Sequence, residues 1–294
     1  MLFNKLFPFL LAYSTANGSV QVSSPLTDLV FDVSEVKREI DISETFILTD
    51  VVGTVVKFET NVSLNDKNFY VELYDTVGSA ATVTTLTSNN FLGYVRNGAY
   101  ENSFIHRLVS DFVLQGGGFT APTVAADQPG SDPTTISSTG TVQNEPGNSN
   151  LRGTIAMAKL AGQPNSATTQ WFINLSDNGF LDSNNGGYTV FGEVLGDGME
   201  IVDFMTSAAT YDATTYYGNT SFSDLPLWRV HTDNIVLPED FLTIKSISQL
   251  DDESELIEFS ASSMDSNKLT VTINEQGQRA GSIILNQGTK LRGR

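Results

Sequence analysis

The chain has 294 residues, 40% of them hydrophobic, and its 34 acidic and 16 basic residues give a formal net charge of −18. This hydrophobic content supports a sizeable core, while the shortage of Lys and Arg argues against nucleic-acid binding, which needs clustered basic residues. With no cysteine and only two histidines, disulfides, thiol catalysis and a zinc site built from Cys or several His are excluded. We interpret the acidity as a solvated surface, with Ca²⁺ binding or adaptation to saline surroundings as alternatives.

The amino terminus has the order of features typical of a secretory signal. Lys5 precedes an apolar run over residues 6–13, and small residues follow at 14–16. We therefore expect residues 1–17 to be a leader, cleaved near Ala16, and the protein to be periplasmic, secreted or at the cell surface. The alternative is an apolar start packed on a domain. No stretch reaches the roughly 18 apolar residues of a membrane helix, so we expect no membrane span.

The first half of the chain predicts strands and one helix. Residues 18–52 read as a β-rich extension without a functional motif. Val55–Thr60 and Phe69–Leu73 alternate in polarity and predict a hairpin. Residues 88–97 predict a short helix capped by Ser88 and ended by Gly98. The Pro-, Gly- and Ser-rich residues 120–150 predict a long surface loop, which in a compact domain is often functional.

The second half continues the β pattern. Strands are expected at 153–158, 170–175 and 188–194, and a second short helix at Met199–Met205. The pattern lapses after residue 206, so we interpret 209–239 as a linker. Four short apolar segments from residue 242 onward predict a small β-sandwich-like module at 240–294. Abundant Gly, Thr and Val favour a mainly β fold throughout.

Three sequence blocks carry the most specific signal. Residues 104–120 read FIHRLVSDFVLQGGGFT. Residues 153–158 read GTIAMA and are followed by SATTQWFIN at 166–174, and FLD at 180–182 precedes YTVFG at 188–192. In content, order and spacing these blocks resemble the cyclophilin family of peptidyl-prolyl cis-trans isomerases, and the resemblance covers about half of the chain.

The resemblance implies a fold and an activity. It implies a closed eight-stranded antiparallel barrel with two short helices, here placed at residues 53–208, with its active site on the outer face. It also implies rotation of X–Pro bonds in proline-containing polypeptides, in support of folding, with no metal or cofactor. Alternatives are a proline-peptide binding or chaperone module without catalysis, and a surface adhesion protein in which the carboxyl-terminal module dominates.

The resemblance assigns site residues one by one. It places the catalytic guanidinium at Arg107 and a hydrogen-bonding partner at Gln115. We interpret His106 as a structural hydrogen-bonding residue more than an acid or base, and Trp171 as a core residue. The expected substrate-binding residues, which form the proline pocket and adjoining groove, are His106, Phe112, Val113, Ala158, Lys159, Leu160, Gln170, Phe172, Phe180, Leu181 and Tyr188.

Several of these residues depart from the family pattern. Lys159 and Leu160 are bulkier than the Asn-Ala common there, so we expect an altered preference for the residue before proline. Phe180 stands where cyclosporin-sensitive members carry Trp, which predicts weak cyclosporin binding. Tyr188 replaces a His and Val113 a Met. These apolar or aromatic exchanges are expected to preserve the pocket while changing its fit.

Overall fold

The computed structural model describes residues 51–64, 68–78, 81–124, 132–229 and 235–251, and further strands nearer both ends by their backbone alone. The chain divides into two units, Val52–Leu250 and a second one formed by Met1–Val51 together with Asp251–Arg294. Among the described residues no helix is long and apolar enough to cross a bilayer.

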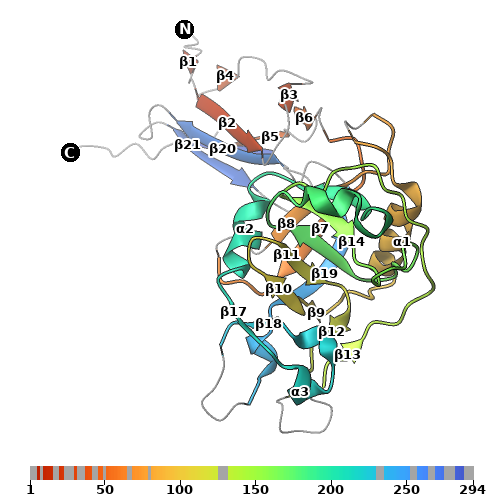
Figure 1. Cartoon of the computed structure of the whole chain (residues 1–294). Helices are drawn as coiled ribbons and strands as arrows, with labels where there is room; N and C mark the ends of the chain where they lie inside the picture. The colour runs from red at the N-terminus through yellow and green to blue at the C-terminus, as the bar shows by residue number, and fades with distance from the viewer. Residues whose placement is uncertain are drawn as a thin grey trace. The chain divides into compact units, whose positions relative to one another are not determined.

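The larger unit is built on one curled sheet in which every pairing of strands is antiparallel (Figure 1). This confirms the expectation of a mainly β fold. In sheet order the strands are β10 (Arg107–Val109), β11 (Val113–Gly116), β15 (Trp171–Asn174), β14 (Thr154–Met157), β16 (Val190–Val194), β8 (Asn68–Leu73), β7 (Val55–Thr60), β19 (Thr243–Gln249), β9 (Ser103–Phe104), β12 (Phe119–Thr120) and β13 (Thr134–Thr135).

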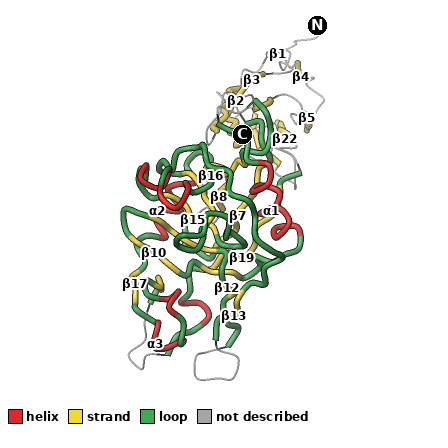
Figure 2. Tube along the Cα trace, turned by 45° about the vertical axis from the view of Figure 1, so that its right-hand side comes forward, coloured by secondary structure: helices red, strands yellow, loops and turns green. Residues whose placement is uncertain are grey.

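Few helices accompany the sheet. Figures 1 and 2 show α1 (Thr85–Arg96) and α2 (Gly198–Met205) on either side of β7 and β8. Both were expected, but a third short helix, α3 (Thr214–Tyr217), was not. Single 3₁₀ turns occur at η1 (Gly179–Asp182), η2 (Asn184–Gly186), η3 (Thr220–Phe222) and η4 (Pro238–Asp240).

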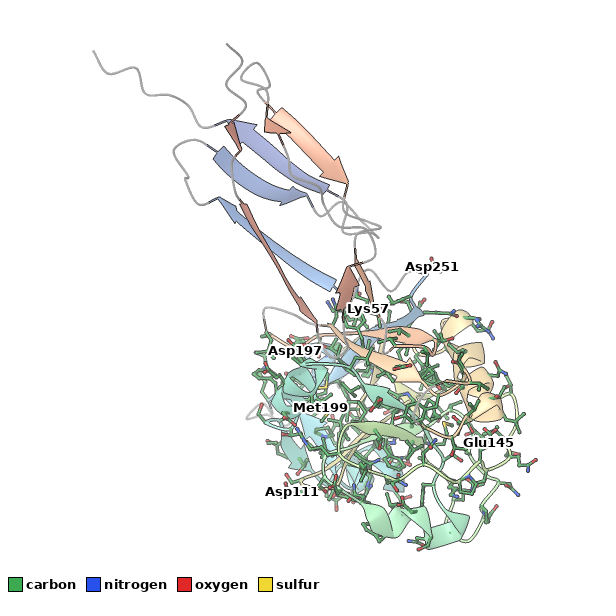
Figure 3. The ribbon with its side chains drawn as sticks, turned by 90° about the horizontal axis from the view of Figure 1, so that it is seen from above. Lys57, Asp111, Glu145, Asp197, Met199 and Asp251 are labelled. Atoms are coloured by element: carbon green, nitrogen blue, oxygen red, sulfur yellow. The ribbon has the colours of Figure 1, made fainter. Side chains whose placement is uncertain are left out.

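The start of α1 differs from the prediction because its cap comes from a distant loop. Ser88 is not the cap but a buried residue inside the helix. The carboxylate of Glu145, a residue labelled in Figure 3, accepts hydrogen bonds from the backbone N–H of Leu86 at 3.2 Å and of Thr87 at 2.8 Å. It thus satisfies first-turn donors that no local side chain reaches. The expected end of the helix at Gly98 is correct, and Gly98 has a φ of +66°.

The interpretation of 209–239 as a linker and of 240 as the start of a separate module is wrong. β19 pairs with β7 on one side and with β9 on the other, so it belongs to the main sheet. Within the expected linker, β17 (Ala209–Tyr211) pairs with β18 (Leu225–Leu227). The aromatic residues Phe104, Phe119, Phe222 and Phe241 join this segment to the sheet in a second apolar cluster. Figures 1 and 2 place α3 and β17 at the same end of the unit as β12 and β13.

The main core lies on the inner face of the sheet. Phe69, Val71 and Leu73 are fully buried, which confirms the alternation predicted for that strand. Trp171 is fully buried too, and its ring meets that of Phe58 edge-on at 5.3 Å. Trp171 is therefore the core residue that the sequence predicted.

The smaller unit pairs strands from both ends of the chain. β20 (Ile257–Ser263) pairs with β2 (Phe9–Thr15), and β22 (Ser282–Gln287) pairs with β21 (Leu269–Asn274) and with β5 (Lys37–Asp41). Two further pairs join β1 (Lys5–Leu6) to β4 (Val30–Phe31) and β3 (Val20–Val22) to β6 (Phe46–Leu48). β5 of the expected extension thus shares a sheet with strands of the expected carboxyl-terminal module, while β2 lies within the stretch expected to be a leader.

The remote cap of α1 makes a testable prediction. Glu145→Ala removes the acceptor of two first-turn amides, which should cost about 1 kcal/mol and lower the melting temperature by about 2–4 °C. Glu101→Ala, an exposed glutamate beyond the end of α1, is the matched control and should be nearly neutral. Equal melting temperatures for the two variants in calorimetry would show that Glu145 does not cap the helix.

Candidate active site

A single row of side chains crosses four neighbouring strands on the outer face of the sheet. In the antiparallel register Arg107 lies opposite Gln115, Gln115 opposite Phe172, and Phe172 opposite Ala156. Residues directly opposite one another in such a sheet point to the same face. The register therefore brings the predicted catalytic pair beside the predicted pocket residue Phe172.

The neighbouring row in the same strands faces inward. Leu114, Ile173 and Ile155 are opposite one another and fully buried in the main core. The strict alternation of the strands thus separates a packed interior from an outer face that carries polar groups.

An apolar cluster separate from the main core lies beside the polar row. Four of the predicted pocket residues, Phe112, Val113, Phe172 and Leu181, meet here. Ala158 and Tyr188 also pack against this cluster, and its buried members are Tyr74, Val113, Ala156, Phe172, Leu181 and Val190. Phe180 is 58% exposed, yet its ring stacks on that of Phe112 at 5.7 Å. The cluster offers an apolar surface at the edge of which Arg107 lies.

The Arg107 guanidinium is partly exposed and is contacted from two sides. Its Cζ lies 5.8 Å from the centre of the Phe112 ring, a cation–π distance. Its Nε lies 3.5 Å from Oδ2 of Asp224. The side chain is 32% exposed, so a bound molecule can reach its N–H groups.

Gln115, Gln170 and His106 form a small polar group beside Arg107. Nε2 of Gln115 donates to Oε1 of Gln170 at 2.9 Å. His106 is 1% exposed, and burial lowers its pKa to about 3 against the opposing effect of a hydrogen bond with Gln170. The imidazole is therefore neutral at physiological pH and lies beneath the surface. It supports Gln170, as the structural interpretation of His106 expected. It does not reach the substrate face, where His106 had also been placed.

The glycines of the GGG segment leave room for this polar group. A Cβ on Gly118 would lie 3.1 Å from Cδ of Gln170 and 3.1 Å from Cε1 of His106. A Cβ on Gly116 would lie 2.8 Å from the Trp171 ring. A side chain at either position would displace Gln170, His106 or Trp171, so glycine is needed for the backbone to pass this close to them.

Lys159 joins two walls of the expected groove. Its amine donates to the carbonyl of Asn185 at 3.0 Å and to that of Gly187, and it lies 4.7 Å from the centre of the Tyr188 ring. Desolvation lowers the pKa of the amine. Leu160, by contrast, is 61% exposed and outside the apolar cluster. Lys159 is thus fixed by the protein itself, while the Leu160 side chain is open to solvent.

Behind the pocket lies a buried amide network that no sequence motif predicted. Asn178 donates from Nδ2 to the carbonyl of Phe112 and to Oδ1 of Asn174, both at 2.9 Å. Asn150 donates from its backbone N–H and its Nδ2 to Oδ1 of Asp182, at 2.8 and 2.9 Å. Although burial opposes the effect, these bonds hold the pKa of Asp182 below its usual value. The one signal that could have revealed it is an Asn at the end of a buried strand, as Asn174 is at the end of β15.

Asp224 was also missed, because the segment that carries it looked like a linker. No sequence pattern joins Asp224 to Arg107, which lies more than one hundred positions earlier in the chain. The pairing of β18 with β17, the aromatic cluster beneath it, and a backbone hydrogen bond from Leu108 to Asp224 bring the two together.

Comparison with known proteins agrees with this geometry. The model of the cyclophilin type peptidyl-prolyl cis-trans isomerase/CLD family matches residues 55–253. A peptidyl-prolyl cis-trans isomerase of Acinetobacter baylyi is 35% identical over 164 residues, which cover 54% of this chain and 76% of that protein. Peptidyl-prolyl cis-trans isomerase B of Escherichia coli is 43% identical over 131 residues, covering 42% and 73%. A Streptomyces antibioticus relative is 41% identical over 131 residues, covering 42% and 72%.

The family match spans β7 to β19, the same strands that form the main sheet, and so includes the segment that had been interpreted as a linker. With this match over more than half of its length, the chain belongs to the cyclophilin-type peptidyl-prolyl cis-trans isomerase family.

Proposed function

We propose that this isomerase works on the outer face of β10, β11, β14 and β15, with Arg107 as its central catalytic residue. The observation that carries the proposal is the row in which Arg107, Gln115 and Phe172 lie opposite one another across three strands. The substrates are proline-containing polypeptides, and the benefit is faster folding of chains limited by X–Pro isomerisation.

The chemistry requires placement rather than a nucleophile. Rotation about an X–Pro bond breaks amide resonance against a barrier of about 18–20 kcal/mol, so uncatalysed exchange takes tens to hundreds of seconds. The twisted state has a pyramidal prolyl nitrogen that can accept a hydrogen bond. The Arg107 guanidinium donates to this nitrogen while the ring is held against Phe172 and Phe112.

Arg107 supplies only part of the acceleration. A gain of about a million-fold corresponds to about 8 kcal/mol, whereas one well-placed donor contributes about 3–4 kcal/mol. Gln115 holds the carbonyl side of the twisted amide, and the apolar cluster excludes water and favours the twisted conformer. Ala158, Lys159, Leu160, Gln170 and Tyr188 border the groove for residues that flank proline.

The proposal includes closure of the sheet into an eight-stranded barrel. Residues 103–109 form one continuous segment whose first part pairs with β19 and whose last part pairs with β11. The backbone N–H of Ile105 donates to Leu242 at 2.9 Å, and that of His106 donates to Gln115 at 3.1 Å. Counting this segment once gives a ring with β11, β15, β14, β16, β8, β7 and β19, which has no free edge.

We also propose a second β module, with residue boundaries that differ from the expected 240–294. Its support is the pairing of β22 with β21 and with β5, a strand that stays in the chain after cleavage of the expected leader. The module then draws on both ends of the chain instead of residues 240–294 alone.

Catalysis is favoured over a purely proline-binding role. The relatives in Acinetobacter baylyi and Escherichia coli are named as isomerases. Arg107 and Gln115 are both present and side by side, and a binding module would not need the donor pair beside the pocket.

Removing the guanidinium should abolish most of the catalysis. Arg107→Ala should lower kcat/KM on a short X–Pro peptide by about 100- to 1000-fold, because one transition-state donor is lost. Arg96→Ala, which removes an exposed hydrogen bond to Gln249 at the end of α1, is the control and should retain full activity. A protease-coupled assay checks both. Wild-type rates no faster than the uncatalysed reaction would refute the proposed function.

Cyclosporin binding should depend on residue 180. Phe180 lacks the indole N–H that a Trp offers as a donor, so the wild type should bind the drug weakly. Phe180→Trp should bind it at least tenfold more tightly in a calorimetric titration, while Phe180→Leu should gain nothing. Tight binding by the wild type would contradict the assigned role of this position.

His106 should remain neutral well below its usual pKa. Between about pH 6.5 and 3 the unfolded chain takes up a proton at His106 that the folded chain does not, so His106 lowers stability as the pH falls through this window. The ring resonances of His106 in NMR, assigned with a His106→Gln variant, should therefore not shift between pH 8 and 5. An inflection near pH 6.5 would show that the imidazole is solvated.

A further inference from the structure

Asp224 is held in place by its neighbours in the chain. Phe222 and Leu225 flank it and are almost fully buried in the second apolar cluster. Leu225 begins β18, which pairs with β17. The hydroxyl of Ser223 donates to Oδ2 of Asp224 at 2.9 Å. The carboxylate therefore projects from an anchored segment in a fixed orientation.

Asp224 contacts the strand of Arg107 at two points. Its backbone carbonyl accepts the N–H of Leu108 at 2.9 Å, on the edge of β10 away from β11. Its Oδ2 lies 3.5 Å from Nε of Arg107. One residue thus fixes both the backbone beside Arg107 and the near end of its guanidinium.

The position of the contact leaves the two terminal nitrogens of the guanidinium available to a substrate. A guanidinium carries five N–H donors in a rigid plane, and Nε is the one nearest the backbone. The Asp224 carboxylate, 3.5 Å from Nε, attracts this end of the guanidinium, and the Phe112 ring contacts the same group at 5.8 Å. The terminal nitrogens are then presented in one orientation.

We propose that Asp224 is a positioning residue that orders the Arg107 guanidinium for catalysis. This inference rests on the proposed function, because it assigns Asp224 a part in the same site. It also assigns a role to the segment between α2 and β19, because this segment places the Asp224 carboxylate at the edge of the groove.

The expected effect is moderate. The two side chains are 32% and 42% exposed, so water screens the pair. Ordering should act mainly on the transition state, where the donor must be aligned, and less on substrate binding. Asp224→Asn should therefore lower kcat by about three- to fivefold with little change in KM, and Asp224→Glu should restore part of the loss.

The experiment compares full-length variants in two measurements. The first is kcat and KM on an X–Pro peptide for wild type, Asp224→Asn, Asp224→Glu and Asp203→Asn. Asp203→Asn is the matched control, because Asp203 forms a similarly exposed Arg–Asp pair with Arg152. The second is the hydrogen-exchange rate of the Arg107 Nε–H by NMR in the ligand-free protein, which should rise several-fold in Asp224→Asn alone.

A double substitution then decides whether Asp224 acts through Arg107. Adding Asp224→Asn to Arg107→Ala should cause no further loss of kcat. A further loss of the same size, an unchanged kcat in the single variant, or unchanged exchange at Nε would each overturn the proposal. An inactive wild type would instead refute the proposed function, and the exchange rates alone would then decide whether Asp224 orders the guanidinium.

Discussion

The antiparallel register of β10, β11, β15 and β14 is the constraint on which the site depends. It places Arg107, Gln115 and Phe172 in one row on the outer face and Leu114 and Ile173 in the row behind. A slip of one residue between β11 and β15 would exchange the two faces. The packed interior therefore fixes the position of the proposed catalytic groups, because those groups can move only if buried core residues leave their places.

Neutral polar groups support this arrangement from within the sheet. His106 stays uncharged because it is buried, and it supports Gln170, which in turn accepts from Gln115. On the pocket side, Asn178 ties the Phe112 carbonyl to Asn174. Because these buried polar groups bond to one another and to residues of the proposed site, the site is preorganised as one unit rather than a set of independent side chains.

The sequence predicted what depends on short-range pattern and on motifs. Alternation revealed the strand around Phe69, and three blocks revealed the family. Contacts between residues far apart in the sequence could not be predicted. Nothing local indicates that Glu145 caps α1, that β19 pairs with β7, or that Asp224 contacts Arg107. The burial of His106 could not be predicted either, because a motif marks the residue as important without showing that it lies beneath the surface. Export stays a prediction, since neither the fold nor the comparison with known proteins bears on the expected leader at residues 1–17.

The central claim is that the proline of the substrate lies on the outer face, against Phe172 and next to Arg107. The most direct measurement is a set of isotope-filtered NOEs between a proline-containing peptide and the full-length protein. The account predicts contacts from the proline ring protons to Phe112, Phe172 and Leu181. Contacts confined to any other surface of the larger unit, or no contacts to the outer face at saturating peptide, would contradict it.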